Sequence, residues 1–174
     1  SKANGGINVL INNAANDTRH TLAAMTTEEW DQSININLRP HFFTAQAVAP
    51  FMKTQGGGSI INFSSNSYMM GNAGLPAYVT SKAGITGLTR SLARELGADG
   101  IRVNTLIPGW VLTERQLKLW ANEKDLAIHM DKQCIKEHLV PKDLVDSTLF
   151  LASNASRMLT GQALVIDGGV VFTG

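Results

Sequence analysis

The sequence predicts an α/β fold built on a doubly wound parallel sheet. Short apolar runs alternate with longer segments in which apolar residues recur every three or four positions, as they do in amphipathic helices. The apolar runs contain little polar alternation, which is typical of strands buried on both faces. Parallel strands need long crossover connections, so this alternation indicates one sheet covered by helices on both sides.

The composition suits one globular domain over residues 1–174. The chain is 44% hydrophobic, its net charge is +1, and its Lys and Arg are scattered, which argues against a surface for nucleic acid or anionic lipid. No apolar run approaches the roughly eighteen residues of a membrane span. The only cysteine, Cys134, cannot form an internal disulfide, and we expect a cytoplasmic location.

The first predicted strand is Ile7–Ile11, a short run rich in β-branched residues. A helix begins at Thr26 or Thr27, because acidic residues follow in its first turn. Its apolar residues keep helical spacing until the glycines that start at Gly56. One long helix is therefore expected, with a local kink at Pro40.

The rest of the chain repeats this pattern of strands and helices. Strands are predicted at 59–63, 101–107 and 163–166, and helices at 77–96 and 141–152. Gly97 suits the end of the helix at 77–96. The polar stretch 64–72 is predicted to lie outside the core.

Ligands of parallel sheets bind beyond the carboxyl ends of the strands. Three segments follow such ends here: Asn12–His20, Ser64–Asn72 and Pro108–Thr113. The helix that carries Tyr78 begins beside them. We therefore expect a ligand site among these loops.

Tyr78 and Lys82 are the first candidates for chemistry. Four positions apart on a helix, they lie on one face, about 5 to 6 Å apart at Cβ. An ammonium beside a phenol favours the phenolate, so Lys82 is expected to lower the pKa of Tyr78 towards the range useful in acid and base catalysis. The alternative is a surface pair that contributes a few tenths of a kcal/mol to the helix.

Five features together resemble the short-chain dehydrogenase/reductase family in order and spacing. They are the segment Asn12–Ala15, Asn37, Ser65, the Tyr78/Lys82 pair and the segment Pro108–Thr113. The resemblance covers the whole chain. It implies a Rossmann-like sheet and an oxidoreductase that transfers a hydride between NAD or NADP and a hydroxyl or carbonyl substrate.

The resemblance also implies a role for each catalytic residue. Tyr78 would be the general acid and base, and Ser65 would orient the same substrate oxygen. Lys82 would lower the pKa of Tyr78 and bind the nicotinamide ribose. Asn37 would hold a water that connects Lys82 to solvent.

Cofactor contacts are implied on both sides of the catalytic pair. The residues concerned are Asn13, Ala14, Ala15, Tyr78, Lys82, Pro108, Gly109, Val111 and Thr113. The family usually has glycine where this chain has Ala15. Glycine permits positive φ or close backbone approach, so Ala15 suggests a slightly different loop path.

The sequence contains no glycine-rich turn between a strand and a helix. In the family such a turn holds the cofactor pyrophosphate. The chain thus resembles the C-terminal two thirds of a family subunit, without the N-terminal βαβ part. The residue that selects NAD or NADP belongs to that part. We expect the chain alone to bind dinucleotide poorly and to be inactive.

The substrate side is predicted from polar loops and a variable segment. Residues 110–140 occupy the place of the family's substrate lid, and Asn66, Asn72 and Trp110 are candidate substrate contacts. The pattern is similar to bacterial aldose 1-dehydrogenases of the galactose or arabinose type, which oxidise the anomeric hydroxyl to a lactone. One alternative is a 3-oxoacyl or other ketone reductase. Another is a non-catalytic dinucleotide-binding scaffold.

No metal is expected, because Cys134 and His138 supply only two ligands. The resemblance implies a homodimer or homotetramer built partly on the helices of Asn37 and Tyr78. Small residues at Gly84 and Gly87 agree with close packing of the second helix, either against another subunit or on the sheet.

Overall fold

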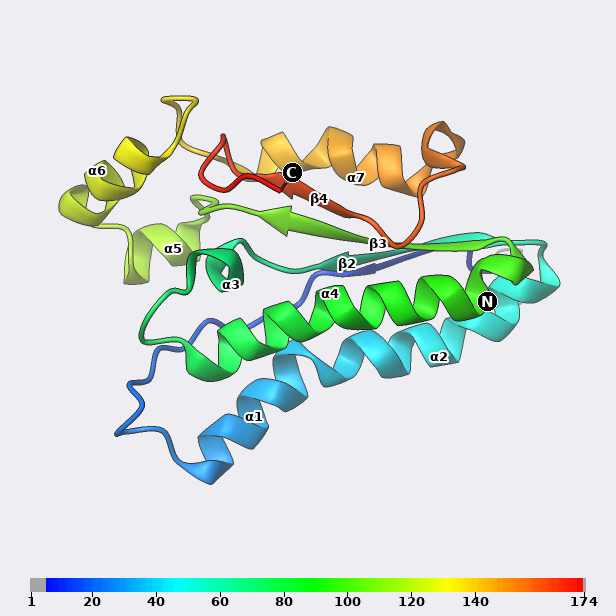
Figure 1. Cartoon of the computed structure of the whole chain (residues 1–174), viewed down its shortest axis with the longest axis horizontal. Coiled ribbons are helices and arrows are strands. Elements are labelled where there is room, and N and C mark those ends of the chain that lie inside the picture. Colours follow the sequence, from blue (N-terminus) through cyan, green and yellow to red (C-terminus); the bar gives the residue numbers. More distant parts are fainter. Residues whose placement is uncertain (1–5, 174) are drawn as a thin grey trace.

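The computed structural model describes residues 6–173 and contains one parallel sheet. Its strands are β1 (Val9–Asn12), β2 (Gly58–Phe63), β3 (Ile101–Pro108) and β4 (Ala163–Ile166). The strands pair in chain order, and every pair is parallel. This arrangement, with helices on both faces, confirms the predicted α/β fold (Figure 1).

Three layers are visible in Figure 1. One face of the sheet is covered by α1 (Thr27–Asn37), α2 (Arg39–Thr54) and α4 (Pro76–Leu96), and the other by α7 (Val145–Ala152). The short helices α3 (Ser67–Met70), α5 (Glu114–Leu119) and α6 (Glu123–Lys132) lie beyond the carboxyl ends of the strands. Single 3₁₀ turns occur at η2 (Gly97–Asp99), η3 (Pro141–Leu144) and η4 (Asn154–Ser156).

The central strands divide their apolar residues between two cores. Ile60 of β2 packs with Met52 of α2 and Leu92 of α4 on one face. The next residue, Ile61, packs with Leu151 of α7 on the other face. Because successive side chains of a strand point to opposite faces, a continuous apolar run such as Gly58–Phe63 supplies both cores.

The prediction that the first strand is buried on both faces is wrong. β1 begins two residues later than predicted, and its side chains Val9 and Ile11 are 39% and 47% exposed. Within residues 6–173 this strand pairs only with β2, so it forms an edge of the sheet. An apolar run by itself does not distinguish an edge strand from a central one.

The predicted kink in the first long helix is a complete break. α1 starts with a capping box between Thr26 and Glu29, as the sequence indicates, and ends at Asn37. Leu38 leaves the helical conformation, and α2 then starts with Pro40 in its first turn. Proline lacks the N–H that a continuous helix needs but is tolerated in a first turn, so the break precedes Pro40.

One further expectation needs correction. The polar stretch 64–72 contributes to the interior, because Ser64, Asn66 and Ser67 are buried. Asn66 Nδ2 donates to Asp167 Oδ2 at 3.1 Å, so polar pairing makes this burial possible. The prediction that the helix ends at Gly97 is confirmed, because α4 ends at Leu96 with Gly97 as its C-cap. Gly97 is right-handed and continues into η2, and the left-handed turn follows at Gly100, which has a φ of 73°.

Candidate functional site

Two cavities open at the carboxyl ends of the strands and share a wall. The first has a volume of about 500 Å³ and the second about 490 Å³. The residues that line both are Ser65, Tyr78, Gly109, Val111 and Thr113. The predicted catalytic hydroxyls therefore stand between the two cavities.

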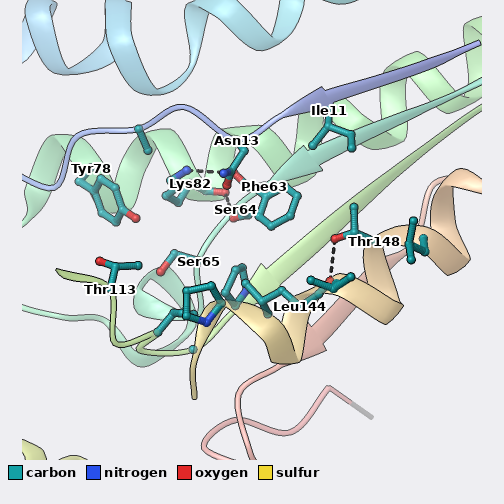
Figure 2. A pocket seen from close by; sticks show the side chains of 17 residues that line it. Ile11, Asn13, Phe63, Ser64, Ser65, Tyr78, Lys82, Thr113, Leu144 and Thr148 are labelled. Atoms are coloured by element: carbon teal, nitrogen blue, oxygen red, sulfur yellow. Dashed lines mark hydrogen bonds between the residues drawn. The ribbon is translucent and has the colours of Figure 1, made fainter. Parts of the chain in front are cut away.

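The first cavity brings together most of the predicted cofactor contacts (Figure 2). They come from the segment after β1, from α4 and from the segment after β3: Asn13, Ala15, Tyr78, Lys82, Pro108, Gly109, Val111 and Thr113. Ala14 lines neither cavity. The remaining wall is mainly apolar and includes Phe63 and Leu144.

The second cavity contains all three predicted substrate contacts, which are Asn66, Asn72 and Trp110. Its other walls come from the loop before α1 and from the segment between β3 and α7. These contribute Asp17, Arg19, Gln116, Asp125, Ile128, His129 and Lys132. The second cavity is therefore more polar than the first.

Lys82 is a buried cation that is held by the backbone. Its Nζ donates to the carbonyl oxygen of Phe63 at 2.9 Å, at the end of β2. Burial lowers the pKa of Lys82 to about 8, so the ammonium form prevails at neutral pH. The Nζ atom lies 5.4 Å from the centre of the Tyr78 ring.

The expected lowering of the Tyr78 pKa is not found in this structure. Burial raises the pKa of Tyr78 to about 12, hydrogen bonding by Ser65 opposes this shift, and the charge of Asp17 adds to it. A buried phenolate loses hydration, and Lys82 directs a proton at Phe63 instead of at the phenol oxygen. Desolvation therefore outweighs hydrogen bonding by Ser65, and Tyr78 is a neutral phenol at neutral pH.

Hydroxyl groups surround the junction of the two cavities. Figure 2 shows the Tyr78 hydroxyl pointing towards Ser65. The Thr113 hydroxyl accepts from the N–H of Gln116 at 3.3 Å and so caps α5. The Ser65 hydroxyl also accepts a hydrogen bond from the N–H of Ser67 at 3.2 Å, which holds it at the start of α3. Hydroxyls both donate and accept, so this cluster can bind a substrate hydroxyl or carbonyl oxygen.

Asn37 lies at the end of α1 and lines neither cavity. Its Oδ1 accepts from the N–H of Asn16 at 2.8 Å, and its Nδ2 donates to the carbonyl of Asn16 at 2.9 Å. The buried side chain thus fixes the loop that carries Asp17 and Arg19. The predicted contact of Asn37 with a water stays a prediction.

His41 is a buried group that the sequence did not reveal. It lies in the first turn of α2, and neither ring nitrogen has a hydrogen-bond partner among the described residues. Burial, and then the charge of Lys82, lower the pKa of His41 to about 4, although nearby backbone carbonyls oppose this. A single histidine in an amphipathic helix carries no signal that would have shown its position near Lys82.

The two ends of the segment between β3 and α7 pair with each other, and the segment is hydrogen-bonded to the loop before α1. Val111 and Leu139 form a parallel bridge at its two ends. Gln116 of α5 accepts from Trp110 Nε1 at 2.9 Å and donates to Asp17 Oδ2 at 2.7 Å. These bonds hold the segment over the second cavity.

Neither a metal cluster nor a membrane helix occurs in the described part of the chain. No three His, Cys, Asp or Glu residues within 6–173 are grouped as ligands for a metal ion. The helices in that same range are too short or too polar to cross a bilayer.

Comparisons with known proteins identify relatives of this chain. A family model described as "Enoyl-(Acyl carrier protein) reductase" matches residues 1–171. A "Probable galactose dehydrogenase" from Rhizobium meliloti is 54% identical over 95% of this chain, and a D-xylose 1-dehydrogenase from Caulobacter vibrioides is 49% identical over 95%. A 3-oxoacyl-[acyl-carrier-protein] reductase from Thermotoga maritima is 40% identical over 96%.

Solved structures show the same fold. A crystal structure from Sinorhizobium meliloti 1021, assigned as a short-chain alcohol dehydrogenase, matches with a TM-score of 0.92 and 31% identity. The match covers 97% of this chain and 67% of that one. The chain spans 65% and 66% of the two sugar dehydrogenases, so it corresponds to about two thirds of their length.

Proposed function

Because the chain belongs to the short-chain dehydrogenase/reductase family, we propose that it forms the catalytic part of an enzyme that oxidises an aldose at C1 to the lactone. The observation that carries this proposal is the position of Ser65 and Tyr78 between two cavities. The similarity to sugar dehydrogenases supports the choice of an aldose.

The first cavity fits a nicotinamide cofactor. Its apolar wall suits a flat ring, and the buried ammonium of Lys82 suits ribose hydroxyls. When bound there, NAD or NADP supplies the hydride acceptor. Asn13, Val111 and Thr113 are the further contacts that we propose for it, together with the main chain at Ala14.

The second cavity would hold the sugar, with residues 110–140 as its lid. Ser65 would donate to the oxygen on C1, and Tyr78 would take the proton from that hydroxyl. The pKa of Tyr78 is raised to about 12 in the chain by itself, so the base form is scarce at neutral pH. We therefore expect sugar oxidation to accelerate as the pH rises from 7 to 9.

The first test replaces Tyr78 by Phe in the natural polypeptide that contains this sequence. Loss of the phenol should lower kcat for aldose oxidation by at least about 10²-fold, with little change in cofactor affinity. Tyr68→Phe is the matched control, because Tyr68 is the only other tyrosine and lines neither cavity. Persisting activity in Tyr78→Phe would show that another group moves the proton.

A reductase of 3-oxoacyl thioesters or other ketones is the second candidate, favoured by the 40% identity to the Thermotoga maritima enzyme. Tyr78 would then protonate the ketone oxygen, and Ser65 would orient it. A panel of aldoses, secondary alcohols and ketones, assayed with NAD(H) and NADP(H), distinguishes the aldose dehydrogenase from the ketone reductase.

A non-catalytic scaffold is the third candidate, and turnover of any of these substrates would exclude it.

A cytoplasmic homodimer or homotetramer completes the proposal. Phe42, Phe43 and Phe51 of α2 are 41%, 46% and 45% exposed, and such apolar surface supports association through this helix. Cys134 is a free cysteine, which agrees with a reducing compartment.

A further inference from the structure

Two buried polar atoms in the wall of the second cavity have no hydrogen-bond partner among residues 6–173. They are the hydroxyl oxygen of Ser67 and the Nε2 atom of His129. A buried polar atom without a partner costs about 1 to 3 kcal/mol, so native proteins seldom retain one without a reason. A ligand with matching polar groups supplies such a reason.

The two residues belong to different elements that line this cavity. Ser67 begins α3, two residues after Ser65, whereas His129 lies on α6 between β3 and α7. Ser65 and Tyr78 line the same cavity. A substrate with its reacting oxygen at Ser65 and Tyr78 therefore occupies the cavity that Ser67 and His129 also line.

The His129 ring is held in place by its neighbours. The Trp110 ring meets it edge to face, with the ring centres 5.4 Å apart. Trp110 is bonded to Gln116, and Gln116 is bonded to Asp17 in the loop before α1. A side chain fixed in this way loses little freedom when a ligand binds.

The charges around the cavity favour a neutral ligand. Arg19 and Lys132 among the lining residues are matched by Asp17 and Asp125. Burial lowers the pKa of His129, followed by the charges of Lys132 and His138, while Asp167 acts in the opposite direction. The imidazole is therefore neutral at neutral pH, and it can pair with a hydroxyl, as can a serine.

We propose that Ser67 and His129 form a subsite that binds hydroxyl groups of the substrate remote from the reacting carbon. This inference rests on the proposed function and identifies residues that select a polyhydroxylated substrate. A site whose buried polar groups need a hydroxyl rejects an analogue without it, because those groups then stay unpaired.

The test uses Ser67→Ala and His129→Phe in the natural polypeptide that contains this sequence. Each is assayed with an aldose, with deoxy analogues that each lack one hydroxyl remote from C1, and with a simple secondary alcohol. We expect kcat/KM for the aldose to fall about tenfold in each variant. Activity on the secondary alcohol should stay within about twofold, because that substrate has no remote hydroxyl.

The wild-type enzyme should prefer the aldose to at least one deoxy analogue by about tenfold, and the matching variant should lose this preference. Ser91→Ala and His138→Phe are the controls, since both residues are exposed and line neither cavity. Equal losses on the sugar and on the secondary alcohol would indicate a merely structural role and overturn the subsite.

The outcomes separate this inference from the proposed function. Wild-type turnover of aldoses with unchanged kinetics in both variants would overturn the subsite alone. A folded wild-type enzyme that oxidises no aldose would overturn the proposed function and, with it, the subsite.

Discussion

At Tyr78, burial and hydrogen bonding by Ser65 act on the pKa of the phenol in opposite directions. Burial has the larger effect and raises the pKa to about 12, while Lys82 interacts with Phe63 and itself has a pKa lowered to about 8. His41 stands in the same interior, and burial lowers its pKa to about 4. The charge state at this end of the sheet is therefore set by desolvation.

His41 makes stability depend on pH. The pKa of His41 in the folded chain is about 4, below the ordinary value of 6.5. Between pH 6.5 and 4, His41 is therefore protonated in the unfolded chain and neutral in the folded chain. The contribution of His41 to the free energy of unfolding is complete above pH 6.5. It is lost at about 1.4 kcal/mol per pH unit as the pH falls towards 4.

Denaturant unfolding of wild type and His41→Leu at pH 7, 6 and 5 measures this contribution. The free energy of unfolding should fall less steeply in His41→Leu, because leucine does not titrate. His138→Leu, a change at an exposed histidine, should keep the wild-type slope. Parallel slopes for wild type and His41→Leu would show that His41 is not buried as described.

Among the elements, α4 carries the catalytic pair and packs closely on the helix break before α2. A Cβ at Gly84 would lie 3.2 Å from Leu38 Cδ2, whereas a Cβ at Gly87 would meet no atom of this chain within 4 Å. Both glycines lie inside the helix, where alanine is the better helix former by about 1 kcal/mol. The contact with Leu38 is thus the main difference between them.

Gly87→Ala should raise the free energy of unfolding by about 0.5 to 1 kcal/mol, because it improves helix propensity without a clash. Gly84→Ala should gain less than half as much, since Leu38 must move by a few tenths of an ångström. Chemical denaturation of both variants compares the two sites directly. Equal gains would mean that Leu38 does not restrict α4.

At the scale of the whole molecule, apolar surface remains uncovered on α2 and along β1. We expect the natural polypeptide to form a homodimer or homotetramer in solution, and light scattering gives its mass. Phe51→Asp should lower the assembly mass, since a charge would be buried at the interface. Leu22→Asp is the control, because Leu22 lies in a loop and is 91% exposed. A monomeric wild type would contradict this prediction.

The sequence by itself determined the order of the four strands, the long helix α4 and the segments after the strands that carry the predicted site residues. These follow from local signals: apolar periodicity, the capping box at Thr26, and ordered motifs that follow strand ends. Asn66, Asn72 and Trp110 could be placed together because the loops after parallel strands meet at one edge.

Only the tertiary structure decided which groups are buried and what that burial does. The neutral state of Tyr78, the isolation of His41 and the unpaired atoms of Ser67 and His129 depend on neighbours far away in the chain. The same is true of β1, whose exposure follows from its place at an edge of the sheet. Desolvation depends on the atoms that surround a group in space, and sequence spacing does not determine them.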